Sequence, residues 1–125
     1  MVSPERKLDS HVQLFNFYGC TPESIIHASK EAIDDMVREA GFGLLDSLLK
    51  TFPGDVSGYT YNAAISESGI DIHTWPEYDM SAQFELHYCN YSRDNSDKAE
   101  RLFKAFEEFF KPERTEYLPS IAFPL

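Results

Sequence analysis

With 125 residues, of which 42% are hydrophobic and 14% aromatic, the chain has the composition of a folded domain with a modest core rather than of a disordered protein. Its net charge of −10 argues against a general nucleic-acid binder, and no apolar run approaches the roughly 20 residues needed to cross a membrane. The start of the chain lacks the apolar core of a signal peptide, so we expect a soluble, cytoplasmic protein with a single domain over residues 1–125.

The first regular elements expected along the chain are a strand and a helix. Residues 12–18 are rich in β-forming side chains and are followed by Gly19, which predicts a strand. Thr21-Pro22-Glu23 is a typical helix start, because a hydroxyl cap precedes a proline at the first helical position. Apolar residues then recur at three-to-four spacing, which predicts a helix over residues 22–40.

The rest of the chain is expected to hold several strands and a second helix. An apolar stripe predicts that helix between Ser96, as its cap, and Pro112, which ends it. Apolar or alternating runs that are bounded by turn residues predict strands at residues 43–52, 57–65, 70–75, 82–89 and 116–118.

This order of elements predicts an α+β fold. We expect a two-layer α/β sandwich, in which a mostly antiparallel sheet of about four strands carries two helices on one face. The other face of the sheet would be partly apolar and uncovered. In so small a protein such a face is usually covered by a second copy of the chain, which predicts a homodimer.

Charge and cysteine content say little about ligands. The acidic surface would suit a cationic substrate, but solubility explains it equally well. Cys20 and Cys89 are too few and too far apart to indicate a disulfide framework or a metal site.

The segment Ile65-Ser66-Glu67-Ser68-Gly69-Ile70-Asp71-Ile72-His73-Thr74-Trp75-Pro76-Glu77 sets an acyl group and a hydroxyl nucleophile side by side at Glu67 and Ser68. Attack of the Ser68 hydroxyl on the Glu67 carbonyl would give an ester by an N-to-O acyl shift. Removal of the Ser68 α-proton would then eliminate the Glu67 carboxylate and leave dehydroalanine, which hydrolyses to a pyruvoyl group and ammonia. The elimination needs a base, and the histidine five residues later, His73, suits that task.

This segment resembles the ESH…IHTWPE signature of the small prokaryotic S-adenosylmethionine decarboxylases, which are pyruvoyl enzymes that cut their own backbone. The resemblance implies cleavage into a β chain, residues 1–67, and an α chain, residues 68–125, with the pyruvoyl group at position 68. His73 matches the family's processing histidine. Ser57, in Val56-Ser57-Gly58, matches the serine that assists ester formation, and Cys89 matches the proton donor in catalysis.

The resemblance also implies a substrate and a cofactor. The pyruvoyl ketone would form a Schiff base with S-adenosylmethionine and accept electrons as carbon dioxide leaves, with neither a metal nor pyridoxal phosphate. Glu77 matches the glutamate that binds the ribose hydroxyls, Phe52 is the candidate for stacking on the adenine, and Glu67 is counted as a further substrate contact. The product would be the aminopropyl donor for spermidine synthesis, made by a homodimer of cleaved αβ units.

The chain departs from the family pattern near the expected pocket. Gly69 stands where the family has a histidine, Glu85 replaces an aspartate, and His87-Tyr88-Cys89-Asn90 replaces FTCG. These changes leave open a pyruvoyl-dependent arginine or ornithine decarboxylase on the same scaffold. A third alternative is an unprocessed, non-catalytic regulatory paralogue, against which the intact set Ser57, Ser68, His73 and Cys89 argues.

Overall fold

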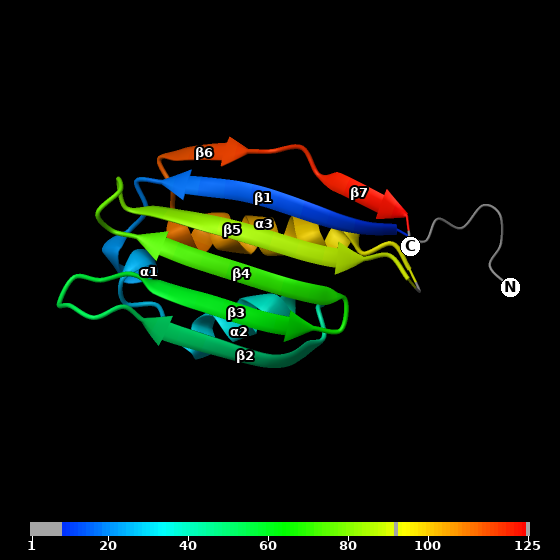
Figure 1. The fold of residues 1–125 in the computed structure, drawn as a ribbon, viewed down its shortest axis with the longest axis horizontal. Coiled ribbons are helices and arrows are strands. Elements are labelled where there is room, and N and C mark those ends of the chain that lie inside the picture. The colour runs from blue at the N-terminus through cyan, green and yellow to red at the C-terminus, as the bar shows by residue number, and fades with distance from the viewer. Residues whose placement is uncertain (1–8, 92, 125) are drawn as a thin grey trace, which may run out of the picture.

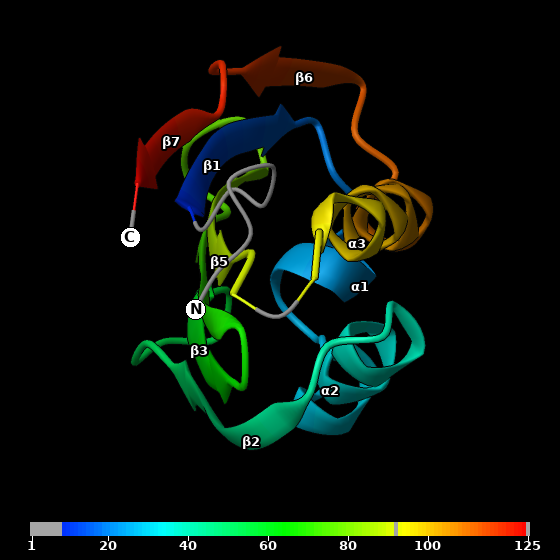
Figure 2. The same ribbon diagram turned by 90° about the vertical axis from the view of Figure 1, so that its right-hand side faces the viewer.

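The protein consists of a single antiparallel sheet with its helices on one face, as the two views in Figure 1 and Figure 2 show. The computed structural model describes residues 9–91 and 93–124. In chain order the elements are β1 (Asp9–Tyr18), α1 (Pro22–Ile25), α2 (Lys30–Glu39), β2 (Leu44–Thr51), β3 (Tyr59–Ile65), β4 (Ser68–Trp75), β5 (Ser81–Cys89), α3 (Ser96–Phe110), β6 (Arg114–Tyr117) and β7 (Ile121–Pro124).

In the described residues the sheet has seven strands, so the expected number of about four is wrong, while the α+β class is confirmed. Its order is β2-β3-β4-β5-β1-β6, and β7 pairs with the same strand β1, nearer the beginning of that strand. Every residue of β6 and β7 is exposed. The strand expected at residues 116–118 overlaps β6, whereas no strand was expected at β7. A short strand without a buried face shows no alternation of apolar and polar residues that could predict it.

The first predicted helix is divided into two. The short helix α1 ends at Ile25, and α2 starts after Ser29, whose hydroxyl accepts a hydrogen bond from the N–H of Ala32 at 3.1 Å. A serine in this position offers the backbone an N-cap instead of a continued helix.

The start of α3 also differs from the prediction. Its cap position is taken by Asn95, and the N–H and hydroxyl of Ser96 both donate to the Asp94 carboxylate. The helix ends at Phe110 and is capped by Lys111, whose backbone is left-handed, one residue before Pro112.

The core lies between the helices and the inner face of the sheet, as Figure 2 shows. Aromatic rings dominate it, and the Phe15 and Phe84 rings stack with their centroids 4.6 Å apart. The α3 side chains that close this layer are Ala99, Leu102, Phe106 and Phe110.

The outer face of the sheet, which the helices leave uncovered, is polar along its central strands and partly apolar on β1 and β2, where Leu14 pairs with Glu85 and the exposed Leu48 pairs with Asn62. Alternation along β3, β4 and β5 turns one set of side chains into the core and the other set outward. The outward set on these strands includes Asn62, Asp71, His73, Gln83, Glu85 and His87. Within residues 9–91 and 93–124, none of the helices has the length and apolar character of a membrane span.

Candidate active site

The Glu67–Ser68 peptide bond lies in the tight turn that joins β3 to β4. The Glu67 carbonyl accepts a hydrogen bond from the N–H of Cys89 at 2.9 Å. Cys89 is itself held in place, because its carbonyl accepts a hydrogen bond from the Asn95 side chain at 2.7 Å. A fixed N–H donor on a carbonyl stabilises the negative charge that develops when a nucleophile attacks it. The backbone of Cys89 is therefore arranged as half of an oxyanion hole for this carbonyl.

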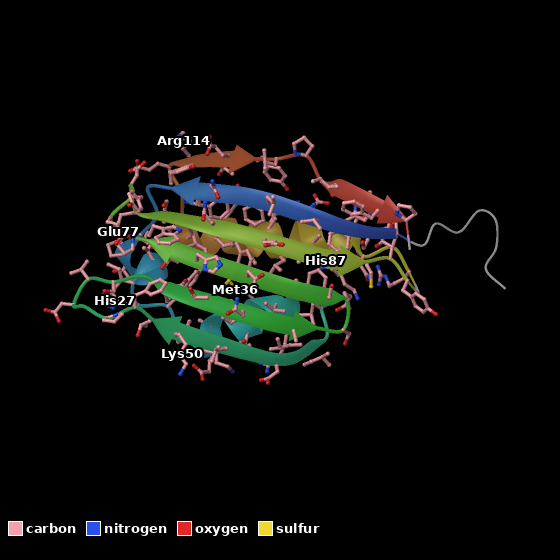
Figure 3. All side chains as sticks on the ribbon, in the orientation of Figure 1. His27, Met36, Lys50, Glu77, His87 and Arg114 are labelled. Atoms are coloured by element: carbon pink, nitrogen blue, oxygen red, sulfur yellow. The ribbon has the colours of Figure 1, made fainter. Side chains whose placement is uncertain are left out.

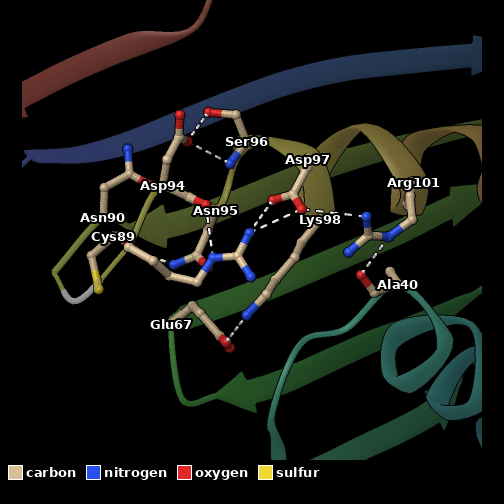
Figure 4. Close-up of polar contacts among 11 residues, drawn as sticks. Ala40, Glu67, Cys89, Asn90, Asp94, Asn95, Ser96, Asp97, Lys98 and Arg101 are labelled. Carbon is tan, nitrogen blue, oxygen red and sulfur yellow. Dashed lines mark hydrogen bonds and ion pairs between the residues drawn. The ribbon is translucent and has the colours of Figure 1, made fainter.

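The Glu67 side chain is anchored away from the outer face. Its carboxylate accepts a hydrogen bond from the Lys98 ammonium at 3.0 Å (Figure 4). A second hydrogen bond comes from the N–H of Gly43 at 3.1 Å. Burial alone would raise the pKa of this carboxyl, but the contacts with Lys98 and Gly43 outweigh it and hold the pKa below its ordinary value. In this structure the carboxylate fixes the turn, and its expected contact with the substrate stays a prediction.

The Ser68 hydroxyl has a partner that the motif did not indicate. Its Oγ lies 3.1 Å from Nδ1 of His87, and the two residues come from neighbouring strands. His87 is labelled on β5 in Figure 3. The alternation that brings Cys89 to the outer face does the same for His87, two residues earlier. The alternation of the strand is therefore a sequence signal that could have identified His87 as a site residue.

His73 is remote from Ser68 within one chain. The two residues are five positions apart on β4, which corresponds to about 16 Å of extended strand. Nδ1 of His73 lies 3.1 Å from the hydroxyl of Thr60, its direct partner on β3. The prediction that His73 is the processing base stays a prediction, and a single copy of the chain does not bring the two groups together.

The remaining expected site residues gather near His73. Ser57 precedes β3 and donates its hydroxyl hydrogen to the Pro53 carbonyl at 2.6 Å. Phe52 is 43% exposed, and its ring stacks on Trp75 with centroids 6.3 Å apart. Glu77 is exposed in the turn after β4 (Figure 3). A pocket of about 450 Å³ opens beside them and is lined by Asn16, Tyr18, Trp75, Tyr78, Ser81 and Gln83.

The expected site is therefore divided between the two ends of the sheet. We call one the serine end, formed by Glu67, Ser68, His87 and Cys89. The other is the histidine end, formed by Phe52, Ser57, His73, Trp75 and Glu77. In the part of the chain that the structure describes, no three His, Cys, Asp or Glu side chains converge in a way that could hold a metal ion.

Both ends of the site lie within a region that matches a known protein family. A family model described as S-adenosylmethionine decarboxylase matches residues 11–119. The chain is similar to an S-adenosylmethionine decarboxylase proenzyme of Archaeoglobus fulgidus, with 33% identity over 98 residues, 77% of this chain and 81% of the relative. A proenzyme of the same description from Thermomicrobium roseum is 31% identical over 114 residues, 90% of this chain and 91% of the relative. Among solved structures, the adenosylmethionine decarboxylase of Aquifex aeolicus VF5 shares the fold, with a TM-score of 0.72 at 23% identity over 94% of this chain and 90% of that one.

Proposed function

Because this chain belongs to the S-adenosylmethionine decarboxylase family, we propose that it cuts itself between Glu67 and Ser68 and then acts as a decarboxylase of S-adenosylmethionine. One observation carries the proposal of self-cleavage. The Glu67 carbonyl accepts the N–H of Cys89 while the next side chain, Ser68, is an exposed hydroxyl that contacts an imidazole. An activated nucleophile beside a polarised carbonyl is the arrangement that an N-to-O acyl shift requires.

The residues of the serine end fit a pyruvoyl group made from Ser68. Ser68 is exposed, so a substrate can reach position 68 after cleavage. The ion pair of Glu67 with Lys98 would hold the new carboxyl end of the β chain beside α3, so that this end does not block position 68. Once formed, the pyruvoyl group would supply the electron sink for decarboxylation. Cys89, on the next strand, would return a proton to the substrate.

The base for the elimination step would come from a second copy of the chain. About 16 Å of strand separates His73 from Ser68 within one chain, which is too far for proton transfer. Two copies could pack with the outer faces of their sheets together, related by a two-fold axis that lies between the sheets and is perpendicular to the strands. The serine end of one copy would then face the histidine end of the other. The same packing would cover the outer face of both sheets. We therefore propose a homodimer with two equivalent sites, each shared between the chains.

The histidine end would hold the adenosyl part of the substrate. Phe52 and Trp75 already form an aromatic pair, and such faces favour a planar base and a nearby sulfonium. Glu77 is exposed in the adjoining turn, where its carboxylate can accept hydrogen bonds from vicinal ribose hydroxyls.

The self-cleavage is tested by the intact mass of the purified protein. The wild-type chain should separate into residues 1–67 and 68–125, with the mass of a pyruvoyl group at position 68. Ser68→Ala should abolish cleavage, because no oxygen nucleophile remains at this position. A wild-type chain that remains intact after prolonged incubation would refute the proposal and favour a non-catalytic regulatory role.

The substrate is tested with Glu77→Gln. Loss of a charge-assisted hydrogen bond costs about 1.5 to 3 kcal/mol, so kcat/KM for S-adenosylmethionine should fall roughly ten- to hundredfold. Self-cleavage should be unchanged, because it involves no ribose. If the cleaved wild-type protein instead releases agmatine from arginine or putrescine from ornithine and ignores S-adenosylmethionine, the proposed substrate is wrong.

A further inference from the structure

The serine end carries a histidine at a position where the family pattern has none. The family has a histidine directly after the nucleophilic serine, where this chain has Gly69. It also has a phenylalanine two residues before the catalytic cysteine, where this chain has His87. Gly69 and His87 are direct partners across β4 and β5. The imidazole of His87 therefore lies on β5 directly opposite the position at which the family pattern has its histidine.

We propose that His87 is a catalytic residue of self-cleavage and takes the proton from the Ser68 hydroxyl as that oxygen attacks the Glu67 carbonyl. This inference rests on the proposed self-cleavage and assigns the base of its first step. The contact that supports it is the 3.1 Å separation between Nδ1 of His87 and Oγ of Ser68. With the ring proton on Nε2, Nδ1 is free to accept this hydroxyl hydrogen.

The absence of a side chain at Gly69 leaves room for the contact between Ser68 and His87. Side chains directly opposite each other in an antiparallel pair lie about 4.5 to 5.5 Å apart at Cβ, so a side chain at position 69 would stand beside the His87 ring. Gly69 leaves that side of β4 unoccupied. His87 is half-buried on β5, whereas Ser68 is exposed at the start of β4, so the ring is held by the sheet and the hydroxyl is accessible.

The proton balance of the step requires one base that can also act as an acid. The Ser68 Oγ–H proton moves to Nδ1 of His87 while a bond forms between Oγ and the Glu67 carbonyl carbon. The charge on the carbonyl oxygen is stabilised by the N–H of Cys89, 2.9 Å away. The C–N bond then breaks, and the imidazolium returns its proton to the departing nitrogen of Ser68. An ester and a free amine result, and the imidazole is restored.

Two histidines would then serve two separate steps. His87 of the same chain would act on the hydroxyl proton in ester formation. His73 of the second copy would act on the α-proton in the elimination. The two roles can be told apart chemically, because hydroxylamine cleaves an ester but leaves an ordinary peptide bond intact.

The test compares three variants of the full chain in a time course of self-cleavage after refolding. His87→Asn keeps a hydrogen-bond acceptor near the Ser68 hydroxyl but cannot take its proton, and His87→Phe installs the residue of the family pattern on the same strand. Both should cleave about 100-fold more slowly than the wild type, within the range that general-base catalysis contributes. The uncleaved chains of both should resist hydroxylamine. His27→Phe, a change of an exposed histidine outside both ends of the site (Figure 3), should cleave at the wild-type rate.

The outcomes separate this inference from the proposed function. If the wild-type and His87→Asn chains cleave at the same rate, the role of His87 is overturned and the proposed self-cleavage stands. Uncleaved His87→Asn that hydroxylamine cuts would also overturn it, because the ester would have formed without the imidazole. A wild-type chain that never cleaves would overturn both proposals. Circular dichroism confirms that each variant is folded, and His87→Phe decides the question if His87→Asn does not fold.

Discussion

Glu67 has two roles. Its side chain makes a structural contact, and its backbone carbonyl belongs to the bond that we propose is cut. Its ion pair with Lys98 joins the turn before β4 to α3, and both side chains are only 12% exposed. The carbonyl of the same residue is the proposed electrophile. The anchor therefore restricts the backbone of the scissile bond before any chemistry begins, which is how positioning lowers a barrier.

Lys98→Met should weaken this anchor and change the pH dependence of stability. The pKa of Glu67 is lowered in the folded protein, so the carboxylate adds stability above its unfolded pKa, about 4.3, and this stability is lost as the pH falls through the lower, folded value. Removing Lys98 should cost about 1.5 to 3 kcal/mol at neutral pH and flatten the loss of stability in acid. Urea unfolding of the uncleaved Ser68→Ala chain between pH 3 and pH 7 measures both effects.

Lys104→Met is the matched control for this prediction. Lys104 pairs with Glu100 on the exposed side of α3, where the two side chains are 66% and 67% exposed. Such pairs contribute about 0 to 1 kcal/mol, so this change should leave both the stability and its pH dependence nearly unaltered. Equal effects of the two substitutions would contradict the anchoring role of Lys98.

At the scale of the elements, Thr74 joins three segments. It is fully buried on β4, and its hydroxyl accepts the N–H of Tyr59 on β3 at 2.8 Å and donates to the carbonyl of Ile25 in α1, also at 2.8 Å. Gly58 lies so close that a Cβ there would come within 2.2 Å of the Thr74 carbonyl oxygen. The threonine of the IHTWPE motif and the glycine of the Val56-Ser57-Gly58 turn therefore form one packed unit that sets the position of the histidine end.

Thr74→Val should destabilise this unit strongly although the two side chains have the same shape. The substitution leaves a buried N–H and a buried carbonyl without their partner, at about 1 to 3 kcal/mol each. We expect a loss of about 2 to 5 kcal/mol in the free energy of unfolding, measured with denaturant on the Ser68→Ala chain. Thr51→Val, at an exposed position of β2, should change it by less than about 0.5 kcal/mol. Similar values for both would show that the hydroxyl contacts of Thr74 are unimportant.

Sequence patterns predicted the elements that carry an apolar run or a regular alternation and failed where that signal is absent. Strands β1 to β5 follow from apolar runs and alternation, whereas the fully exposed strand β7 leaves no such pattern. The division between α1 and α2 depends on the cap at Ser29, which competes with a stretch of continuous helical periodicity. Tertiary packing decides whether the cap or the continued helix forms. The helical repeat in the sequence carries no information on that packing.

For the site too, the sequence alone does not tell which residues lie close together in space. The sequence predicts that Ser68 and His73 act in one reaction, because the elimination needs a base and His73 matches the processing histidine of the resemblance. In an extended strand the five positions from Ser68 to His73 span about 16 Å within one chain. Conversely, His87 lies 19 positions from Ser68 in sequence and contacts it across the sheet. Strand alternation gives the face of each residue, but only strand register and assembly reveal which of these residues meet.

At the scale of the whole molecule, the uncovered outer face and the divided site have one explanation in common. A face that bears His73, Asp71, Glu85 and His87 is costly to pack against an apolar surface, but it can pack against its own copy if the polar groups find partners. The helices already cover the inner face, so dimerisation through the outer face would give four layers, with the two sheets inside. Each shared site would lie between those sheets, where water is excluded.

Mixed dimers test whether the two ends of the site come from different chains. Ser68→Ala and His73→Ala chains with different tags, coexpressed and purified through both tags, should contain one complete site per dimer. In that site Ser68 of the His73→Ala chain faces His73 of its partner, so about half of all chains, all of them His73→Ala chains, should cleave. Each variant alone should remain uncleaved, with the His73→Ala chain held at the hydroxylamine-sensitive ester. The control pairs a wild-type chain with a chain that carries both substitutions, and there the wild-type chain should fail to complete cleavage. If that wild-type chain is processed normally, His73 acts within its own chain, and the shared site is wrong.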